Sequence, residues 1–483
     1  MRKFLTISLI SLCSACAIGP DYQKNEIYSE KQISKELNIN NNLNANVSTE
    51  WFKLFNDAYL NELINIALKN SPTINIAKEK LYQARHNLYI TEADLLPSFD
   101  ATGEYIKSSP ASVVEPMAKQ NYYQVGFDAS WEIDIWGGKR RLIESQKAIF
   151  KSVGANFNNV KLILISEIAL NYVNWHLYQK LIDETNITIE NQTKIFETTK
   201  SKYDAGLVDE LTLNQAESLL KSTKQKLTQY IINKKNTLNS LAILIGILPS
   251  KIKKSDSSIY DNEISFDLKL LYNLPANVIQ TRPDIWAAEQ QLIAQNALIG
   301  NKISKIFPSL SLSTFLGFQN NTLSPIFAKD YNMYSNNIET ILPVLHWGKI
   351  INDIKIQRST TKEAFETYKT SVLQGIINVK NAITSVEENS KNSKLAKENF
   401  SLYQNIVELS KQKYENGIIA FSDYVNAEQD KISAQISKYQ SLNNLFIGII
   451  SFYKAIGGGF QTNYSATDDQ KVLTTSVDEP CKG

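Results

Sequence analysis

"SWEIDIWGGKRRLIES", Ser130 to Ser145, passes from an alternating, strand-like stretch through Trp-Gly-Gly into a basic, helix-like sequence. A similar corner recurs at "LPVLHWGKIINDIK", Leu342 to Lys355. The tryptophans of the two corners, Trp136 and Trp347, lie 211 residues apart. Because a glycine follows each tryptophan, both corners have the backbone freedom to turn sharply from a strand into a helix.

The same shift of 211 residues aligns further landmarks of the chain without a gap. The matched positions are Pro72 with Pro283, Pro97 with Pro308, Gly137 with Gly348, and Lys202–Gly206 with Lys413–Gly417. So many matches of special residues at one shift indicate an internal duplication. We therefore divide the chain into a first repeat, residues 51–260, and a second repeat, residues 261–458.

Each repeat reads in one order: a helix, two strands, the corner, a very long helix, a glycine turn and a return helix. The long helix of the first repeat carries apolar residues every seven positions from Ile168 to Tyr203, a narrow seam typical of helices packed sideways on neighbours. From Lys139 to Tyr203 it would be about 95 Å long. Gly206 and Gly417 predict hairpin tips. An ordinary coiled-coil hairpin fits these segments equally well.

The return helices, Glu210 to Ile247 and Ser422 to Ile456, are much shorter than the outgoing helices. The segments Tyr59 to Leu95 and Ala276 to Ile306 have the right size to stack end to end with them. Each repeat would then present two full-length helical rods.

The N-terminus, "MRKFLTISLISLCSAC", has a basic pair, a short apolar run and small residues before Cys16. These features predict a secretory signal over residues 1–15 and, with the small residues next to the cysteine, acylation of Cys16. Two alternatives remain open. Cys13 could be acylated, although Leu12 would then precede the cleavage point, or an ordinary signal peptidase could leave Cys16 unmodified.

The two ends of the mature chain read as poorly structured. Residues 16–50 predict an extended segment, and residues 459–483, rich in Thr, Ser, Asp and Lys, predict a disordered tail. After removal of Cys13 and acylation of Cys16, Cys481 would be the remaining thiol, so no disulfide is expected.

Alternating side chains predict strands that need cover on one face. In Tyr122 to Asp134, apolar residues alternate with polar ones, and Phe99 to Tyr105 and Leu310 to Phe318 repeat the pattern. A soluble sheet with one wet face has the same pattern. A secreted lipoprotein built of long rods has little else to cover the apolar face, so the context favours lipid. Four strands are too few for a barrel, which takes about eight, whereas three copies would supply about twelve.

Composition and motifs argue against several functions. The 483 residues carry 51 Lys and Arg against 49 Asp and Glu, a net charge of +2, without the dense basic block typical of nucleic-acid binding. His86, His176 and His346 are scattered and fit packing or surface positions, so we expect no metal site. Phosphate-binding loops and catalytic elbows are absent from the sequence, so we expect no cofactor and no enzyme activity. No later stretch reaches the roughly 18 consecutive apolar residues of a membrane helix.

Five motifs together resemble a known family. They are "CAIGPDY" at Cys16–Tyr22, "WFKLFNDAYL" at Trp51–Leu60, "SWEIDIWGGKR" at Ser130–Arg140, "TRPDIWAAEQQLIAQNALIG" at Thr281–Gly300 and "FPSLSL" at Phe307–Leu312. With them, the chain resembles the TolC-like outer-membrane efflux lipoproteins, the exit ducts of resistance–nodulation–division pumps. The resemblance covers nearly the whole mature chain.

That resemblance implies a mainly α-helical fold with a transmembrane β-barrel. The family forms homotrimers with a twelve-stranded barrel in the bacterial outer membrane and a twelve-helix α-barrel in the periplasm. It also implies two partners, a periplasmic adaptor protein and an inner-membrane proton-driven pump.

The family narrows the periplasmic tip with an aspartate and an arginine around an Ala-Gln pair. In this chain the matching stretch is "GIIAFSDYVNAEQD", Gly417 to Asp430, which has the uncharged residues Asn426 and Gln429 at those two positions. The substitution argues against the charged gate of the family. A polar ring and a solvated helix end are equally good readings of this stretch. The candidate gate residues are Tyr414, Asp423, Asn426, Glu428 and Gln429.

The corners themselves allow two readings. Aromatic and basic residues together could form a binding motif. The geometric reading, which we favour, uses Gly137 and Gly348 for the turn and sets Trp136 and Trp347 at the membrane–water interface. Basic residues are fewer in the second repeat, so turn geometry is the shared requirement.

The leading functional hypothesis is therefore a gated exit duct for drugs or other small solutes. A duct for type I protein secretion would share the fold. A periplasmic coiled-coil scaffold without a pore would explain the helical seams but not the alternating strands.

Overall fold

The computed structural model describes residues 17–24, 26–39, 48–108, 120–253, 259–260, 266–324 and 326–460. The predicted signal, Cys16 and the tail from residue 461 lie outside these residues. The chain forms two compact units, one of residues 1–25, 80–154 and 287–369 and the other of residues 26–79, 155–286 and 370–483. Each unit draws residues from both repeats.

The duplication is visible in the bounds of the helices. In the first repeat they are α3 (Ala58–Asn70), α4 (Pro72–Ala93), α5 (Gly138–Asp204) and α6 (Glu210–Ile245). In the second they are α7 (Pro283–Ser304), α8 (Lys349–Glu415) and α9 (Phe421–Ala455). Both ends of α4 and α7, and both ends of α5 and α8, differ by the same 211 residues. Among the helices described, none has an apolar stretch long enough to cross a membrane.

The helical segment that opens each repeat differs from the prediction. The segment Tyr59 to Leu95 is divided between α3 and α4, because Pro72 has no N–H to continue the hydrogen-bond ladder. In the second repeat, Ala276–Ile279 is a short 3₁₀ turn, and α7 begins only at Pro283, the match of Pro72. Proline at the first helical position is favoured because its missing donor is not needed there.

Residues 16–50 were predicted to be extended, but the segment contains helix α2 (Glu30–Leu37). Ser29 and Gln32 form a reciprocal capping box at its start, and Asn38 ends it in the left-handed conformation. Ile33 and Leu37 are buried, so the helix is held by packing on one face as well as by its caps.

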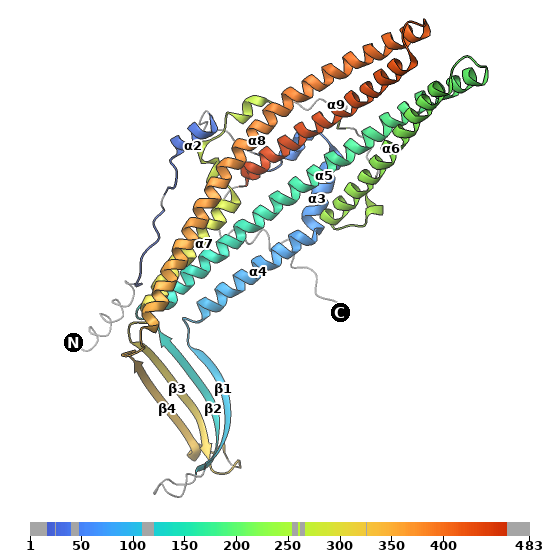
Figure 1. Ribbon diagram of the computed structural model, residues 1–483. Coiled ribbons are helices and arrows are strands. Elements are labelled where there is room, and N and C mark those ends of the chain that lie inside the picture. The colour runs from blue at the N-terminus through green and yellow to red at the C-terminus, as the bar shows by residue number, and fades with distance from the viewer. Residues whose placement is uncertain are drawn as a thin grey trace. The chain divides into compact units, whose positions relative to one another are not determined.

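Four antiparallel strands form one sheet in the order β1 (Ser98–Ser108), β2 (Gln120–Ile133), β3 (Ser309–Asn320) and β4 (Asn332–Ile341). Figure 1 shows the strands of the second repeat beside those of the first. The duplication predicts the fourth strand, although the alternating pattern located only the other three. β1 and β4 are the outer strands of this sheet.

The two hairpins have the same register. Paired residue numbers sum to 228 between β1 and β2, as for Ser98 with Ser130, and to 650 between β3 and β4, as for Ser309 with Ile341. The two sums differ by twice 211, so every pair between β3 and β4 has an equivalent between β1 and β2. Between the hairpins, β2 and β3 pair with a sum of 443, as for Phe127 with Leu316.

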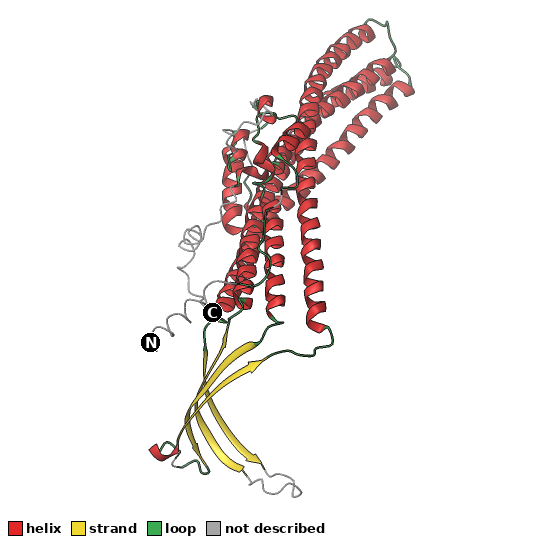
Figure 2. Ribbon diagram, turned by 90° about the vertical axis from the view of Figure 1, so that its left-hand side faces the viewer, coloured by secondary structure: helices red, strands yellow, loops and turns green. Residues whose placement is uncertain are grey.

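This register confirms the predicted division of faces. Ala101, Phe127, Leu316 and Tyr334 form one row across the sheet, and the last three are exposed. The opposite face carries polar groups such as Asp128, which accepts a hydrogen bond from the Thr102 hydroxyl at 2.6 Å. The strongly twisted sheet in Figure 2 therefore has one apolar face, across both repeats, that the described chain leaves open to solvent.

Phe315 is an exception on the polar face. Its side chain is buried, and its ring lies across Gly126 and Gly317, which face one another on β2 and β3. A β-carbon on either glycine would come within 2.6 Å of the ring, so two glycines are needed to accommodate the aromatic plate.

The second unit has an aromatic core where the sequence offers "WFKLF". Trp51 stacks on Tyr453 of α9 with ring centroids 5.3 Å apart. The Tyr172 hydroxyl donates to Asp57, whose other oxygen caps α3. His176 packs 4.5 Å from the Tyr172 ring, and burial lowers the pKa of this histidine to about 4. His176 is thus a neutral core residue near neutral pH, as its scattered position predicted.

Candidate functional site

The first corner is a strand end joined to a helix cap. Gly137 has a φ of +75°, a conformation that favours glycine, and the Asp134 carboxylate accepts hydrogen bonds from the backbone of Lys139 and Arg140 at 3.0 Å. Trp136 stacks on Phe307 with centroids 4.7 Å apart. Its indole Nε1 donates to the Pro308 carbonyl at 2.8 Å, which joins the corner of the first repeat to the start of β3 in the second.

A short N-terminal segment, residues 17–24, which we call the strap, lies along this corner. The Ile18 N–H donates to the Trp136 carbonyl at 3.1 Å. Further along, the Asn296 amide donates to the Pro20 carbonyl, and the Tyr22 hydroxyl donates to Glu289 at 3.3 Å. The strap therefore contacts α5 and α7, one helix from each repeat.

Arg141 is the residue that holds the strap. Its side chain is 7% exposed and forms an ion pair with Asp21 at 2.7 Å. The same guanidinium donates to the carbonyls of residues 17, 18 and 19 at 3.2–3.3 Å. Gly300 makes room beside it, because a β-carbon there would collide with the Ile18 carbonyl. Sequence reasoning missed this role and considered the basic residues of the corner only as part of a possible binding motif.

Cys16 lies outside the described residues, but its neighbour is fixed. Ala17 packs so closely on Gly137 that a β-carbon at Gly137 would come 2.6 Å from the Ala17 Cα. Ala17, the first described residue of the strap, therefore lies against the first corner.

The second corner keeps the turn but not the packing. Gly348 has a φ of +76°, and Trp347 is itself left-handed, with a φ of +47°. Trp347 is 88% exposed, in contrast to the half-buried Trp136. The strap-binding residues have no equivalents here, since the shift of 211 places Asn352 where the first corner has Arg141.

The hairpin tips have the predicted caps. Gly206 and Gly417 both have a φ of +73°, and each donates back to a tyrosine carbonyl at 2.8–2.9 Å. Behind the second tip, Tyr414 stacks on Tyr424 and contacts Phe421 in a cluster that includes Val407.

The five candidate gate residues do not gather in one polar ring within this chain. Glu428 is buried, accepts a hydrogen bond from the Tyr424 hydroxyl at 3.3 Å and pairs with Lys431 at 2.7 Å. Burial and the nearby Glu428 carboxylate raise the pKa of Tyr424. Asp423, Asn426 and Gln429 are instead exposed at three-residue spacing, on one face of α9. Glu428 is therefore a structural residue of the tip, separate from that exposed face.

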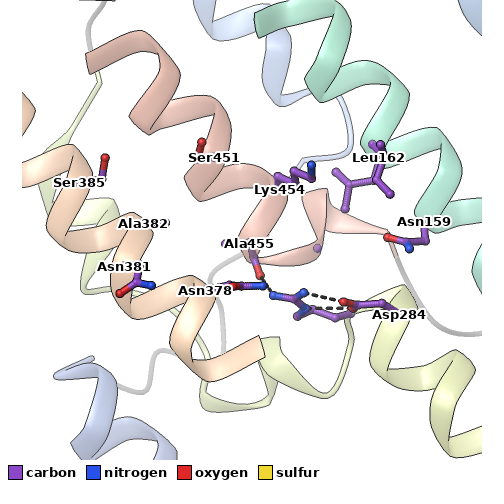
Figure 3. A pocket seen from close by; sticks show the side chains of 13 residues that line it. Asn159, Leu162, Asp284, Asn378, Asn381, Ala382, Ser385, Ser451, Lys454 and Ala455 are labelled. Carbon is purple, nitrogen blue, oxygen red and sulfur yellow. Dashed lines mark hydrogen bonds and ion pairs between the residues drawn. The ribbon is translucent and has the colours of Figure 1, made fainter. Parts of the chain in front are cut away.

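A cavity of about 500 Å³, lined by both polar and apolar residues, lies in the second unit. Figure 3 shows Asn159 of α5, Asn378 and Asn381 of α8, and Lys454 of α9 around it. Arg282, which also lines the cavity, is engaged, because it pairs with Asp284 and donates to the Ala455 carbonyl at 2.6 Å. The motif "TRPDI" thus fastens the start of α7 to the end of α9.

The cavity contains no constellation that suggests catalysis. Its lining holds no histidine or cysteine, and its one carboxylate, Asp284, is committed to Arg282. In the part of the chain that the structure describes, no group of three or more His, Cys, Asp or Glu side chains could hold a metal ion.

Comparisons with known proteins agree on one family. The sequence profile of the outer membrane efflux protein family matches residues 63–247 and 274–458. Nodulation protein T of Rhizobium leguminosarum bv. trifolii is 25% identical over 95% of this chain and 97% of its own length. The toluene efflux pump outer membrane protein TtgC of Pseudomonas putida is 24% identical over 98% and 99%. The crystal structure of the Campylobacter jejuni CmeC outer membrane channel superimposes with a TM-score of 0.82 at 25% identity, over 95% of this chain and 98% of that one.

The two corner glycines allow a matched test of the strap contact. Gly348→Ala should cost about 1 kcal/mol, the strain of a left-handed alanine, because the nearest atom to its new β-carbon lies 3.5 Å away. Gly137→Ala adds a clash with Ala17 to the same strain and should cost at least about 2 kcal/mol. Unfolding of the two variants in detergent measures the difference. Equal costs would show that the strap does not press on the corner.

Proposed function

The chain belongs to the outer membrane efflux protein family and is the outer-membrane component of an efflux pump, and we propose that it acts as a homotrimeric, gated exit duct. In this proposal, three copies close a twelve-stranded barrel in the outer membrane and a twelve-helix tunnel in the periplasm. The duct itself catalyses no reaction, and an inner-membrane proton-driven pump supplies the energy for transport.

One observation carries the proposal: the sheet has an open apolar face and two open edges. Phe127, Leu316 and Tyr334 lie exposed in one row of that face. Hydrocarbon would cover these side chains, and water would wet the opposite face with Asp128. In hydrocarbon the edges of β1 and β4 need partners, because unpaired peptide groups cost several kcal/mol each there. Further copies of the sheet supply such partners.

The strap supports an anchor beside the barrel. Ala17, the residue that follows Cys16 in the sequence, packs on Gly137. If Cys16 is acylated, the first corner would therefore lie near the periplasmic surface of the membrane. Trp136 and Trp347 would then lie at the interface where indole rings are favoured.

Cargo and partners follow from the relatives' names and from the family. The name of TtgC assigns that relative to a toluene efflux pump. We propose small solutes as the cargo of this chain, with a periplasmic adaptor that contacts the hairpin tips behind Gly206 and Gly417.

Purified oligomers tested in planar bilayers should give discrete channel conductance, because the proposed barrel encloses water. Deletion of the gene should raise accumulation of toxic small solutes in cells and leave secreted proteins unchanged. Absence of conductance from well-folded oligomers would favour a scaffold without a pore. Lost protein secretion with unchanged solute accumulation would favour type I secretion.

Metabolic labelling with a radioactive fatty acid tests the anchor. Cys16→Ser should abolish labelling, whereas the matched variant Cys13→Ser should keep it, since Cys13 belongs to the removed signal. Labelling that depends on Cys13 instead would place the acylated residue three positions earlier.

Substitutions at the tip separate its exposed face from its buried carboxylate. Replacing Asn426 and Gln429 together by arginine should change single-channel conductance at least about twofold, because both side chains are exposed on α9. Glu428→Gln should leave conductance unchanged and cost about 1 kcal/mol of stability through the lost pair with Lys431. A larger conductance change from Glu428→Gln than from the double variant would contradict this assignment.

A further inference from the structure

The cavity of the second unit lies at the joint where α9 ends and α7 begins. A β-carbon on Gly457, just past α9, would lie 3.5 Å from the Pro283 ring at the start of α7. Residues of α5 and α8 complete the lining. The volume of about 500 Å³ falls within the range of small-molecule sites, so the joint leaves room for a ligand inside one chain.

Four polar side chains of the lining are not engaged by the protein. They are Asn159 of α5, Asn381 of α8, and Ser451 and Lys454 of α9. Among the residues that the structure describes, none forms a hydrogen bond or an ion pair with these four side chains. In the view of Figure 3, Asn159 lies on one side and Asn381 on the other, with Lys454 between them. The cavity therefore offers a ligand two amides, a hydroxyl and an ammonium group.

Lys454 sets the charge of the cavity. The other charged residues of the lining, Arg282 and Asp284, form an ion pair through two hydrogen bonds of 3.0 and 2.6 Å, so their charges offset one another. The apolar part of the lining, which includes Leu162 and Ile163, contains no aromatic ring on which a flat ligand could stack. This composition suits an anion with further hydrogen-bonding groups better than an aromatic or cationic solute.

The first repeat indicates that the joint itself does not require these polar groups. The shift of 211 keeps the glycine and the proline of the joint as Gly246 and Pro72, and a β-carbon on that glycine would again lie close to the proline ring, at 2.9 Å. The same shift sets Ile243 at the position of Lys454 and a leucine at that of Asn381. The ammonium and the amide are thus additions of the second repeat and are free to serve a ligand.

We propose that this cavity binds a small organic carboxylate that carries hydroxyl or amide groups, with its carboxylate on Lys454 and its other polar groups on Asn159 and Asn381. Acidic amino sugars have this chemistry. All lining residues belong to the second unit, so the site goes beyond the exit duct and does not depend on the number of copies. A ligand held there joins α5, α8 and α9 and stabilises their packing.

N-acetylmuramic acid is the probe, because it combines a carboxylate with an acetamido group and several hydroxyls. Calorimetric titration of the full-length protein in detergent should give a dissociation constant below about 1 mM, and the probe should raise the unfolding temperature. N-acetylglucosamine is the matched control, since it lacks the lactic acid group. It should bind at least about tenfold more weakly, because hydrogen bonds to charged groups are the stronger ones.

Lys454→Ile tests the cation with the residue that the first repeat carries at this position. It should weaken binding of N-acetylmuramic acid at least about tenfold, leave binding of N-acetylglucosamine unchanged and preserve the unfolding temperature without ligand. Lys454→Arg should keep most of the affinity. Lys397→Met removes an exposed lysine of α8 outside the lining and should bind the probe like the parent protein.

Absence of binding at probe concentrations up to about 10 mM would reject the site. Equal affinities for the two sugars would reject a carboxylate as the recognised group. Equal loss from Lys454→Ile and Lys397→Met would show that binding follows the overall charge of the protein, and it would also reject the site. Channel conductance of the same preparation tests the exit duct separately, so the two proposals can fail independently.

Discussion

A peptide group in hydrocarbon must be hydrogen-bonded to another peptide group, because no water is available to replace the partner. The four-stranded sheet satisfies this requirement where neighbouring strands pair, but not at the outer edges of β1 and β4. In the proposed duct, lipid would cover the apolar face, and strands of further copies would cover the two edges. Within the chain, the duplication already joins the two hairpins, because β2 of the first repeat pairs with β3 of the second.

The two repeats match closely in the bounds of their helices and in their corner glycines, and they differ in the residues that contact the strap. The bounds of α5 and α8 correspond residue for residue, and both corners turn on a left-handed glycine. The chain has one N-terminus, however, so only one corner receives the strap. Arg141 and Gly300 serve that corner, while their shifted positions hold Asn352 and Tyr89. The richer basic content of the first corner therefore reflects binding to the protein's own backbone and to Asp134.

Periodic features of the fold could be predicted from the sequence, because heptads, alternation and the 211-residue shift repeat over many residues. Contacts between distant single residues could not. Arg141 reads as one more cation in a basic run until the strap is brought beside it. Glu428 reads as a charge at a solvated helix end, but Tyr424 and Lys431 on the same helix enclose it. Helix α2 was missed because its two buried apolar residues, Ile33 and Leu37, span only about one helical turn, which is too short a pattern to recognise in the sequence.

The strap also sets an order of events during synthesis. Residues 17–24 leave the ribosome long before their partners, because Arg141 follows Asp21 by 120 residues and Asn296 follows Pro20 by 276. The segment cannot settle until α5 and then α7 of the second repeat have been made. The strap is thus translated long before the two helices that hold it. A membrane tether at its end would hold the growing chain near the bilayer throughout that interval.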